Sequence, residues 1–156
     1  MKRSFLATWL FLDARHQIHA FSNDGSQLIM SLGTWNESGE SPTHLGRPQD
    51  IAFLSDGGIV VADGLINSRV AKFDSTGKFI KAWGSKGTEN GQFDAVHAVA
   101  IDQQDRIYVA DRSNDRIQVF DKNGQHLSTW NGLNFPNHIV ITKNQDVWVA
   151  DNQLFN

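Results

Sequence analysis

The sequence contains no cysteine, which excludes disulfide frameworks and thiolate metal sites. It also has no apolar run as long as the roughly 20 residues that a membrane-spanning helix needs. The net charge is −3 and charges of both signs are interspersed, so the chain lacks the clustered Lys and Arg on which nucleic-acid binding depends. Gly-x-Ser-x-Gly, a phosphate-binding loop, a dinucleotide fingerprint and His-Glu-x-x-His are all absent. We therefore expect neither nucleic acid nor a membrane as a partner.

The first residues combine a charged pair, Lys2-Arg3, with the apolar run SFLATWLFL. This pattern is typical of a secretory signal, but no small-x-small cleavage site follows it. The segment LATWLFLDA also matches two later segments of strand character, GGIVVADG and DRIYVADR. We therefore favour a β-strand here, and the sequence predicts no cellular compartment.

Hydrophobic residues make up 40% of the chain, which is enough to bury a core, and they recur in short runs that end in aspartate. These runs are WLFLD, IVVAD, IYVAD and VWVAD, closed by Asp13, Asp63, Asp111 and Asp151 at intervals of 50, 48 and 40 residues. After the first three come QIHAF, RVAKF and RIQVF, then a hairpin turn with glycine, then another apolar run. Four strands in 40 to 50 residues are typical of a β-propeller blade.

The repeat predicts an all-β fold, a single partial β-propeller over residues 1–156 with four-stranded antiparallel blades. We expect an incomplete blade at 7–33, full blades at 48–84 and 97–132, the start of another at 136–151, and a surface loop at 36–46. This is about three and a quarter blades, whereas closed propellers usually carry four to eight. The open edges of such an arc favour self-association. Either two chains complete one ring or the chain is a fragment of a larger propeller, and the strand count favours the fragment.

The pattern Pro-x-x-Ile-Ala … Val-Ala-Asp … Asn-x-Arg-Ile-x-Val-Phe-Asp … Gly … Trp-Gly resembles the NHL repeat, which occurs in six-bladed propellers. The likeness covers roughly residues 7–151. Two stretches also resemble consecutive blades of peptidylglycine amidating lyases: RPQDIAF…VADGLINSRVAKFDSTGKFIKAWG and GQFDAVHAVAI…VADRSNDRIQVF. Bacterial NHL proteins share the same sequence motifs. These lyases are zinc-dependent and split peptidyl-α-hydroxyglycine into an amide and glyoxylate.

The lyase resemblance implies a small set of site residues. His97 matches a position that brings a zinc ligand, and Arg112 matches an arginine that lines the active site, which makes it the candidate catalytic residue. Leu65 stands where the lyases have a tyrosine, and Asn137 stands where another zinc histidine is expected, with His138 one residue late. Because innermost strands alternate their faces, this slip turns His138 away from the channel. If the chain is lyase-like, zinc or calcium is the expected cofactor.

Both main candidates have structural alternatives. His97 can be a rim histidine that is hydrogen-bonded to a neighbouring strand, since a catalytic zinc normally has three protein ligands. Arg112 can brace the turn after its own strand through bidentate hydrogen bonds. Positions that recur in register with the repeat are expected to bridge strand ends: Asp63, Arg69, Asp111, Arg116 and Asp151. Three tryptophans are expected to pack between blades: Trp83, Trp130 and Trp148.

Two functions of different classes follow from these residues. The favoured one is a non-catalytic scaffold or binding module that takes a protein, a peptide or a small polar ligand at one rim of the propeller. The alternative is a part of a zinc-dependent amidating-lyase-like enzyme. Because Leu65 replaces the tyrosine and at least one zinc histidine is missing, we expect no lyase activity from the chain alone.

Overall fold

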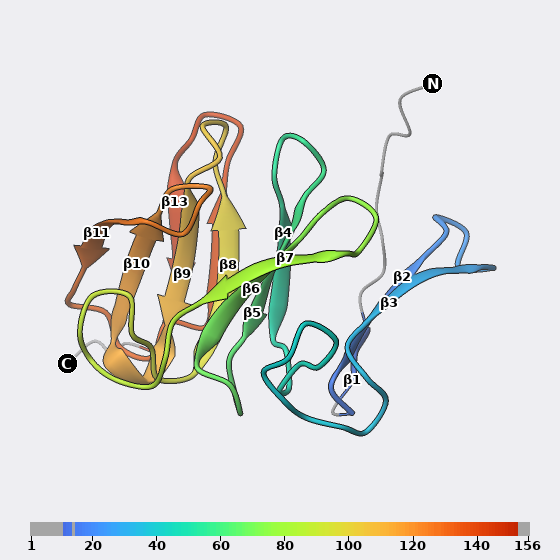
Figure 1. Ribbon diagram of the computed structural model, residues 1–156. Helices are drawn as coiled ribbons and strands as arrows, with labels where there is room; N and C mark the ends of the chain where they lie inside the picture. Colours follow the sequence, from blue (N-terminus) through green and yellow to red (C-terminus); the bar gives the residue numbers. More distant parts are fainter. Residues whose placement is uncertain (1–10, 14, 153–156) are drawn as a thin grey trace.

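The computed structural model describes residues 11–13 and 15–152, and its strands form small antiparallel sheets that follow one another along the chain (Figure 1). The sheet orders are β1-β2-β3, β4-β5-β6-β7, β8-β9-β10-β11 and β12-β13. The strands of the first two sheets are β1 (Phe11–Asp13), β2 (Gln17–Phe21), β3 (Leu28–Leu32), β4 (Asp50–Phe53), β5 (Ile59–Asp63), β6 (Arg69–Phe73) and β7 (Phe79–Trp83). Those of the last two are β8 (Val96–Ile101), β9 (Ile107–Asp111), β10 (Arg116–Phe120), β11 (His126–Trp130), β12 (His138–Ile141) and β13 (Val147–Ala150).

These sheets confirm the predicted all-β fold with four-stranded antiparallel blades. Each blade is a meander in which consecutive strands pair, and within the described ranges the helical element is the short 3-10 turn η1 (Arg112–Asn114). The predicted strand residues 7–10 lie outside the described residues. No helix in the part of the chain that the structure describes is long and apolar enough to cross a lipid bilayer.

The blades pack face to face through aliphatic side chains. Between the second and third sheets, Val60 and Ala62 of β5 belong to one cluster with Val99 of β8 and Val109 of β9. Comparable clusters lie between the first and second sheets and between the third and fourth. Every residue of β5 and β9 is buried, because both faces of these strands meet a neighbouring blade. This double burial explains the continuous apolar runs IVVAD and IYVAD.

Most of the loop at residues 36–46 lies at the surface, as predicted, but its last two residues are buried. Its end turns inward, so that Leu45 is only 1% exposed and joins the core between the first two sheets. A parallel bridge joins Ser38 to Leu45, and the next loop between blades repeats it with Lys86 and Phe93. Both loops therefore close over the blade junction with a buried apolar residue, which composition alone did not reveal.

An aspartate at the end of β5 ties the first of these loops to its blade. Asp63 Oδ1 accepts a hydrogen bond from the backbone N–H of Gly46 at 2.5 Å. Asp63 Oδ2 accepts from Asn67 Nδ2 at 2.8 Å and from Arg69 Nε at 2.7 Å. The Arg69 guanidinium also donates to three loop carbonyls: those of Gly39, Glu40 and His44. Carboxylate and guanidinium are both buried, so each is the main counter-charge of the other.

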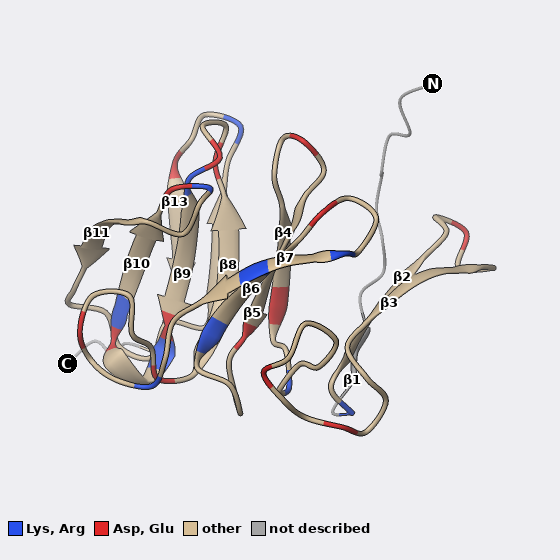
Figure 2. Cartoon of the chain, in the orientation of Figure 1, with Lys and Arg blue, Asp and Glu red and all other residues tan. Residues whose placement is uncertain are grey.

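The third sheet repeats this arrangement one blade later. Asp111 accepts from the backbone N–H of Asp94 at 2.7 Å, from the Asn114 side chain, and from Arg116 Nε at 2.7 Å. Arg116 then donates to loop carbonyls of Thr88, Glu89 and Gln92. Figure 2 shows the acidic end of β9 beside the basic start of β10. We call each such set, an aspartate with its Asn-x-Arg partners and loop, an Asp–Arg staple.

At the fourth sheet, Asp151 Oδ2 accepts a hydrogen bond from the backbone N–H of Asn134 at 3.4 Å. This contact corresponds to those of Gly46 and Asp94, because Asn134 lies in the loop that leads into β12. The repeated aspartate thus meets the same kind of loop amide in three successive blades.

The expectation that three tryptophans pack between blades is met by Trp83, which packs against the cluster between the second and third sheets. Gly124 lies against its ring, where a Cβ at position 124 would come within 2.7 Å of the indole. Trp130 is 40% exposed, and its ring makes an edge-to-face contact with Tyr108 of the same blade. Trp148 contradicts the expectation, since 68% of it is exposed on β13.

Replacing Arg116 with methionine tests the Asp–Arg staple. Arg116→Met keeps most of the alkyl length but leaves the buried Asp111 carboxylate without its counter-charge. We expect the free energy of unfolding to fall by about 3 kcal/mol or more in urea titrations. Lys86→Met is the matched control, because Lys86 lies in the same loop and forms an exposed pair with Asp94. Lys86→Met should lower the free energy of unfolding by less than about 1 kcal/mol. Equal losses in the two variants would contradict the staple.

Candidate functional site

Three of the residues singled out by the sequence come together at one rim of the arc. His97 lies near the start of β8, Arg112 follows β9 in η1, and Asn137 precedes β12. Since β8 and β9 are antiparallel, the start of one and the end of the other meet at the same rim. β12 lies next to β8 in the following blade, which brings Asn137 to them.

His97 is presented by a β-bulge. Val96 pairs with Asp111 and Ala98 with Ala110, so His97 is the extra residue of β8 at this point. A bulge of this kind changes the direction of the side chain and is common beside functional sites. The equivalent residues, Gln49 and Asn137, directly precede β4 and β12, and their backbone N–H groups donate to the carbonyls of Ala62 and Ala150. No pattern in the sequence predicts this bulge.

A second backbone feature recurs at this rim. Two residues before each rim position, the chain takes a positive φ: Arg47 (59°), Ala95 (58°) and Phe135 (49°) precede Gln49, His97 and Asn137. Residues other than glycine rarely adopt this conformation. Because it occurs at the same position in three blades, it belongs to the repeat itself. The repeat therefore supplies a common rim position, and the residue there varies from blade to blade.

Asn137 connects the other two side chains. Its backbone carbonyl lies 2.7 Å from His97 Nδ1, and its side-chain Oδ1 accepts a hydrogen bond from Arg112 Nε at 2.8 Å. Asn137 Nδ2 in turn donates to Asn152 Oδ1 at 3.0 Å. We call His97, Arg112 and Asn137 the rim site. Asn152 is a member of its surroundings that the sequence did not single out.

The bond from His97 fixes its neutral tautomer. A backbone carbonyl only accepts, so the proton must be on Nδ1, and the lone pair of the neutral ring is on Nε2. Histidine ligands of metals commonly show this arrangement, in which one ring nitrogen donates to a carbonyl and the other coordinates. The same contact also fits the structural alternative of a histidine bonded to the neighbouring blade.

Arg112 differs from the two arginines of the staples. Arg69 and Arg116 are buried, pair with an aspartate and donate further to loop carbonyls. Arg112 is only partly buried, and its Nε–H bond to Asn137 is the one side-chain hydrogen bond it makes within residues 15–152. It also lies 5.2 Å above the ring of Phe135. Within residues 15–152, the Arg112 side chain therefore contacts the next blade and makes no hydrogen bond to its own turn.

Apolar residues stand exposed on loops of the second and fourth blades. Leu65 and Ile66 belong to the loop after β5, which corresponds to the η1 loop of the next blade, and Phe135 leads into β12. Phe135 is held by Asp115, whose carboxylate accepts its backbone N–H at 2.8 Å. The sequence marked Leu65 only as a replaced tyrosine and did not mark Phe135.

His138 lies beside this site but points differently. Its side chain is exposed at the start of β12, while the next residue, Ile139, is buried against the third blade. The charges of His97 and His138 both act on the pKa of Asp50 in β4. Burial raises the pKa of Asp50, while the backbone N–H groups of Val99 and Ile51 and the two histidines oppose the increase.

The donor set does not fit a complete catalytic zinc site. In the described part of the chain, no three His, Cys, Asp or Glu side chains are placed to hold one metal ion. A catalytic zinc needs three protein ligands and one open position. His97 has the tautomer of a ligand, but these residues alone supply no second and third donor.

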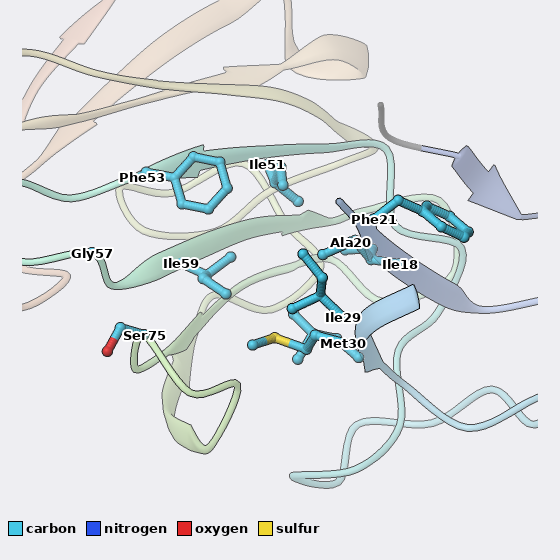
Figure 3. A pocket seen from close by; sticks show the side chains of 11 residues that line it. Ile18, Ala20, Phe21, Ile29, Met30, Ile51, Phe53, Gly57, Ile59 and Ser75 are labelled. Atoms are coloured by element: carbon cyan, nitrogen blue, oxygen red, sulfur yellow. The ribbon is translucent and has the colours of Figure 1, made fainter. Parts of the chain in front are cut away.

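An apolar pocket of about 50 Å³ lies between the first and second blades (Figure 3). Aliphatic and aromatic side chains of β2, β3, β4 and β5 line it, among them Met30, Ile51 and Phe53, and Ser75 is a polar residue at its edge. It contains none of the predicted site residues. Its small volume and apolar walls give it no means of orienting a polar ligand.

Replacing Asp50 with asparagine tests the electrostatics of the inner strands. Because burial raises the pKa of Asp50 above 3.8, the folded chain binds this proton more tightly than the unfolded chain. The free energy of unfolding should therefore fall as the pH rises above the ordinary pKa of an aspartate, and Asp50→Asn should reduce this fall. Asp24→Asn is a control of opposite sign, since hydrogen bonds from Ser22 and Ser26 lower the pKa of Asp24 to about 2. An unchanged pH profile in Asp50→Asn would contradict the assignment.

Comparison with known proteins identifies the repeat from which the blades are built. The NHL repeat model matches residues 45–73 and 93–120. The probable peptidyl-alpha-hydroxyglycine alpha-amidating lyase of Caenorhabditis elegans is 35% identical over 115 residues, which are 72% of this chain and 33% of that protein. The NHL repeat-containing protein 3 of Homo sapiens is 36% identical over 122 residues, 74% of this chain and 35% of that protein. The chain thus spans about a third of the length of these relatives.

Among solved structures, a streptogramin B lyase overlaps with a TM-score of 0.64 at 14% identity, over 88% of this chain and 42% of that one. The virginiamycin B lyase from Staphylococcus aureus overlaps with a TM-score of 0.59 at 12% identity, over 94% of this chain and 52% of that one. These similarities establish the fold, and the repeat matches establish the type of blade. The chain contains NHL repeats at residues 45–73 and 93–120, and its sheets are consecutive blades of a partial β-propeller.

Proposed function

We propose that this propeller arc is a binding module whose rim site takes a peptide or small polar ligand through a carboxylate group. The observation that carries the proposal is Arg112, whose guanidinium is oriented by Asn137 through Nε alone. A guanidinium held by one edge presents its other edge for two parallel hydrogen bonds to a carboxylate.

The surroundings of Arg112 support a ligand with both polar and apolar parts. Phe135 lies under the guanidinium and limits its movement. His97 offers Nε2 as an acceptor on the same rim, because Nδ1 is occupied by Asn137. Leu65 and Ile66 are exposed in the second blade and can contact apolar side chains of a bound peptide. This combination suits a peptide end that carries a carboxylate next to an apolar residue.

Titration with a pair of peptides tests the proposal. An acetylated peptide with an apolar last residue and a free carboxylate should bind, and the same peptide with a terminal amide should bind at least about tenfold more weakly. Arg112→Gln should remove this difference in a calorimetric titration. Arg106→Gln is the control, since Arg106 pairs with Asp102 after the innermost strand, at the opposite rim. Equal affinity for the two peptides, or equal effects of the two substitutions, would contradict the proposal.

A second candidate is a part of an amidating-lyase-like metalloenzyme, which the tautomer of His97 and the named relatives favour. The rim site would then supply one zinc ligand and an arginine for the substrate. Against it stand the single suitable donor among the described residues and Leu65 in place of the tyrosine. The two candidates are separated by assaying the purified chain with an α-hydroxyglycine peptide. Turnover that depends on added zinc favours the enzyme, and carboxylate binding without turnover favours the binding module.

A further inference from the structure

In the loop between β3 and β4, a histidine lies between a carboxylate and a hydroxyl group (Figure 1). His44 Nε2 is 3.2 Å from Glu37 Oε2, and His44 Nδ1 is 2.6 Å from Ser41 Oγ. None of these residues belongs to the rim site, and Ser41 is exposed. A serine, a histidine and a carboxylate linked in this order form the triad of serine hydrolases, which is recognised by geometry and not by sequence position.

The contact with Glu37 determines which nitrogen of His44 carries the proton. A carboxylate only accepts hydrogen bonds, so the proton of the neutral ring is on Nε2 and the lone pair is on Nδ1. The Ser41 hydroxyl therefore donates to Nδ1, and its oxygen accepts the backbone N–H of Thr43 at 3.3 Å. The Thr43 hydroxyl is farther from Nδ1, at 3.1 Å. In this state His44 can take the proton of Ser41 as a general base.

The Asp–Arg staple of the second blade fixes the backbone that carries these side chains. Arg69 is buried and donates to three loop carbonyls: those of Gly39, Glu40 and His44. Gly39 also lies against the His44 side chain, since a Cβ at position 39 would come within 3.1 Å of the His44 Cβ. The positions of Ser41 and His44 are therefore set by contacts below the surface. A catalytic site needs rigid support of this kind.

The equivalent loop of the next blade forms the same backbone without these three side chains. Aligned on their parallel bridges, the two loops place the following residues at equivalent positions: Glu37 and Ser85, Ser41 and Glu89, His44 and Gln92. The backbone N–H of His44 donates to the carbonyl of Ser41, and the equivalent pair in the next loop does the same. In that loop Gln92 Oε1 accepts a backbone N–H, that of Glu89, at 3.1 Å. The fold of the loop therefore does not require a serine, a histidine and a glutamate here.

We propose that Ser41 and His44 are the catalytic residues of an esterase site and that Glu37 is the positioning residue of His44. Ser41 Oγ attacks the carbonyl carbon of an ester while its proton passes to His44 Nδ1. The imidazolium, paired with the Glu37 carboxylate, gives this proton to the alkoxide that leaves as the C–O bond breaks, which yields an acyl-serine and an alcohol. Water then attacks the acyl group through the same proton transfers, which releases a carboxylic acid and restores Ser41.

The exposure and the charge of the loop define the class of ester. Ser41 and Pro42 are both exposed, so a long acyl chain has little apolar surface to bind there. Glu37 and Glu40 are exposed carboxylates of the same loop and repel an anionic substrate. We therefore expect small, uncharged acyl esters with a good leaving group to react, and p-nitrophenyl acetate is a probe of this class.

Hydrolysis of p-nitrophenyl acetate by the 156-residue chain tests the proposal. Ser41→Ala and His44→Gln should each lower kcat at least about 100-fold, because nucleophile and base act as one unit. Glu37→Gln should lower kcat at least about tenfold with KM nearly unchanged, as expected of a residue that acts through His44. Ser38→Ala is the matched control, since Ser38 is an exposed serine of the same loop, and it should change kcat less than about twofold.

A fluorophosphonate probe identifies the nucleophile directly, because an activated serine oxygen bonds to its phosphorus and displaces fluoride. Peptide mass spectrometry should find this adduct on Ser41 of the unsubstituted chain and none on Ser41 in His44→Gln. Far-ultraviolet circular dichroism checks that the variants keep their strands, and His44→Gln provides the residue type that the next loop has at this position. Absence of the adduct from Ser41, hydrolysis that Ser41→Ala leaves unchanged, or equal losses in Ser41→Ala and Ser38→Ala would overturn the proposal.

Discussion

The buried pair of an aspartate and an arginine at the end of the second strand of each full blade is the interaction on which the rest depends. Each carboxylate accepts a loop amide, and each guanidinium takes several loop carbonyls. Removing two charges from water is costly, and here the cost is offset by hydrogen bonds on nearly every polar atom. These hydrogen bonds hold each long loop between blades in one conformation. Leu45 and Phe93 are buried beneath these loops, so the staple also closes the core between blades.

The rim site follows from this constraint. The stapled loops lead directly into β4 and β8, and the equivalent loop before β12 is bonded to Asp151. Each loop ends in the positive-φ residue that sets the rim position two residues later. His97 and Asn137 therefore lie on a backbone frame that three successive blades share, while the side chains at this position differ between blades. Arg112 comes from the turn between the aspartate and the arginine of the staple in the third sheet, so the rim site and this staple share one element.

Much of the fold could be predicted because the sequence repeats its strands at nearly constant spacing. The runs IVVAD and IYVAD indicated buried strands, and the glycine turns indicated hairpins. The rim site was predicted only in part. His97 and Arg112 were suggested by the resemblance to amidating lyases, but the bulge at His97 and the contacts of Asn137 depend on pairing across the sheet. Trp148 was misjudged, because its place in the apolar run VWVAD suggested burial, whereas most of the side chain is exposed on β13.

Native-state hydrogen exchange is the most direct test of the staples as the organising constraint. The amides of Gly46 and Asp94 lie in loops but donate to buried carboxylates. If the staples make loop and blade one cooperative unit, these amides should exchange with the same free energy of opening as the amide of Val109 in the centre of β9. The amide of Thr76, in the exposed turn between β6 and β7, should exchange much faster. Exchange of Gly46 and Asp94 at the rate of Thr76 would contradict the account.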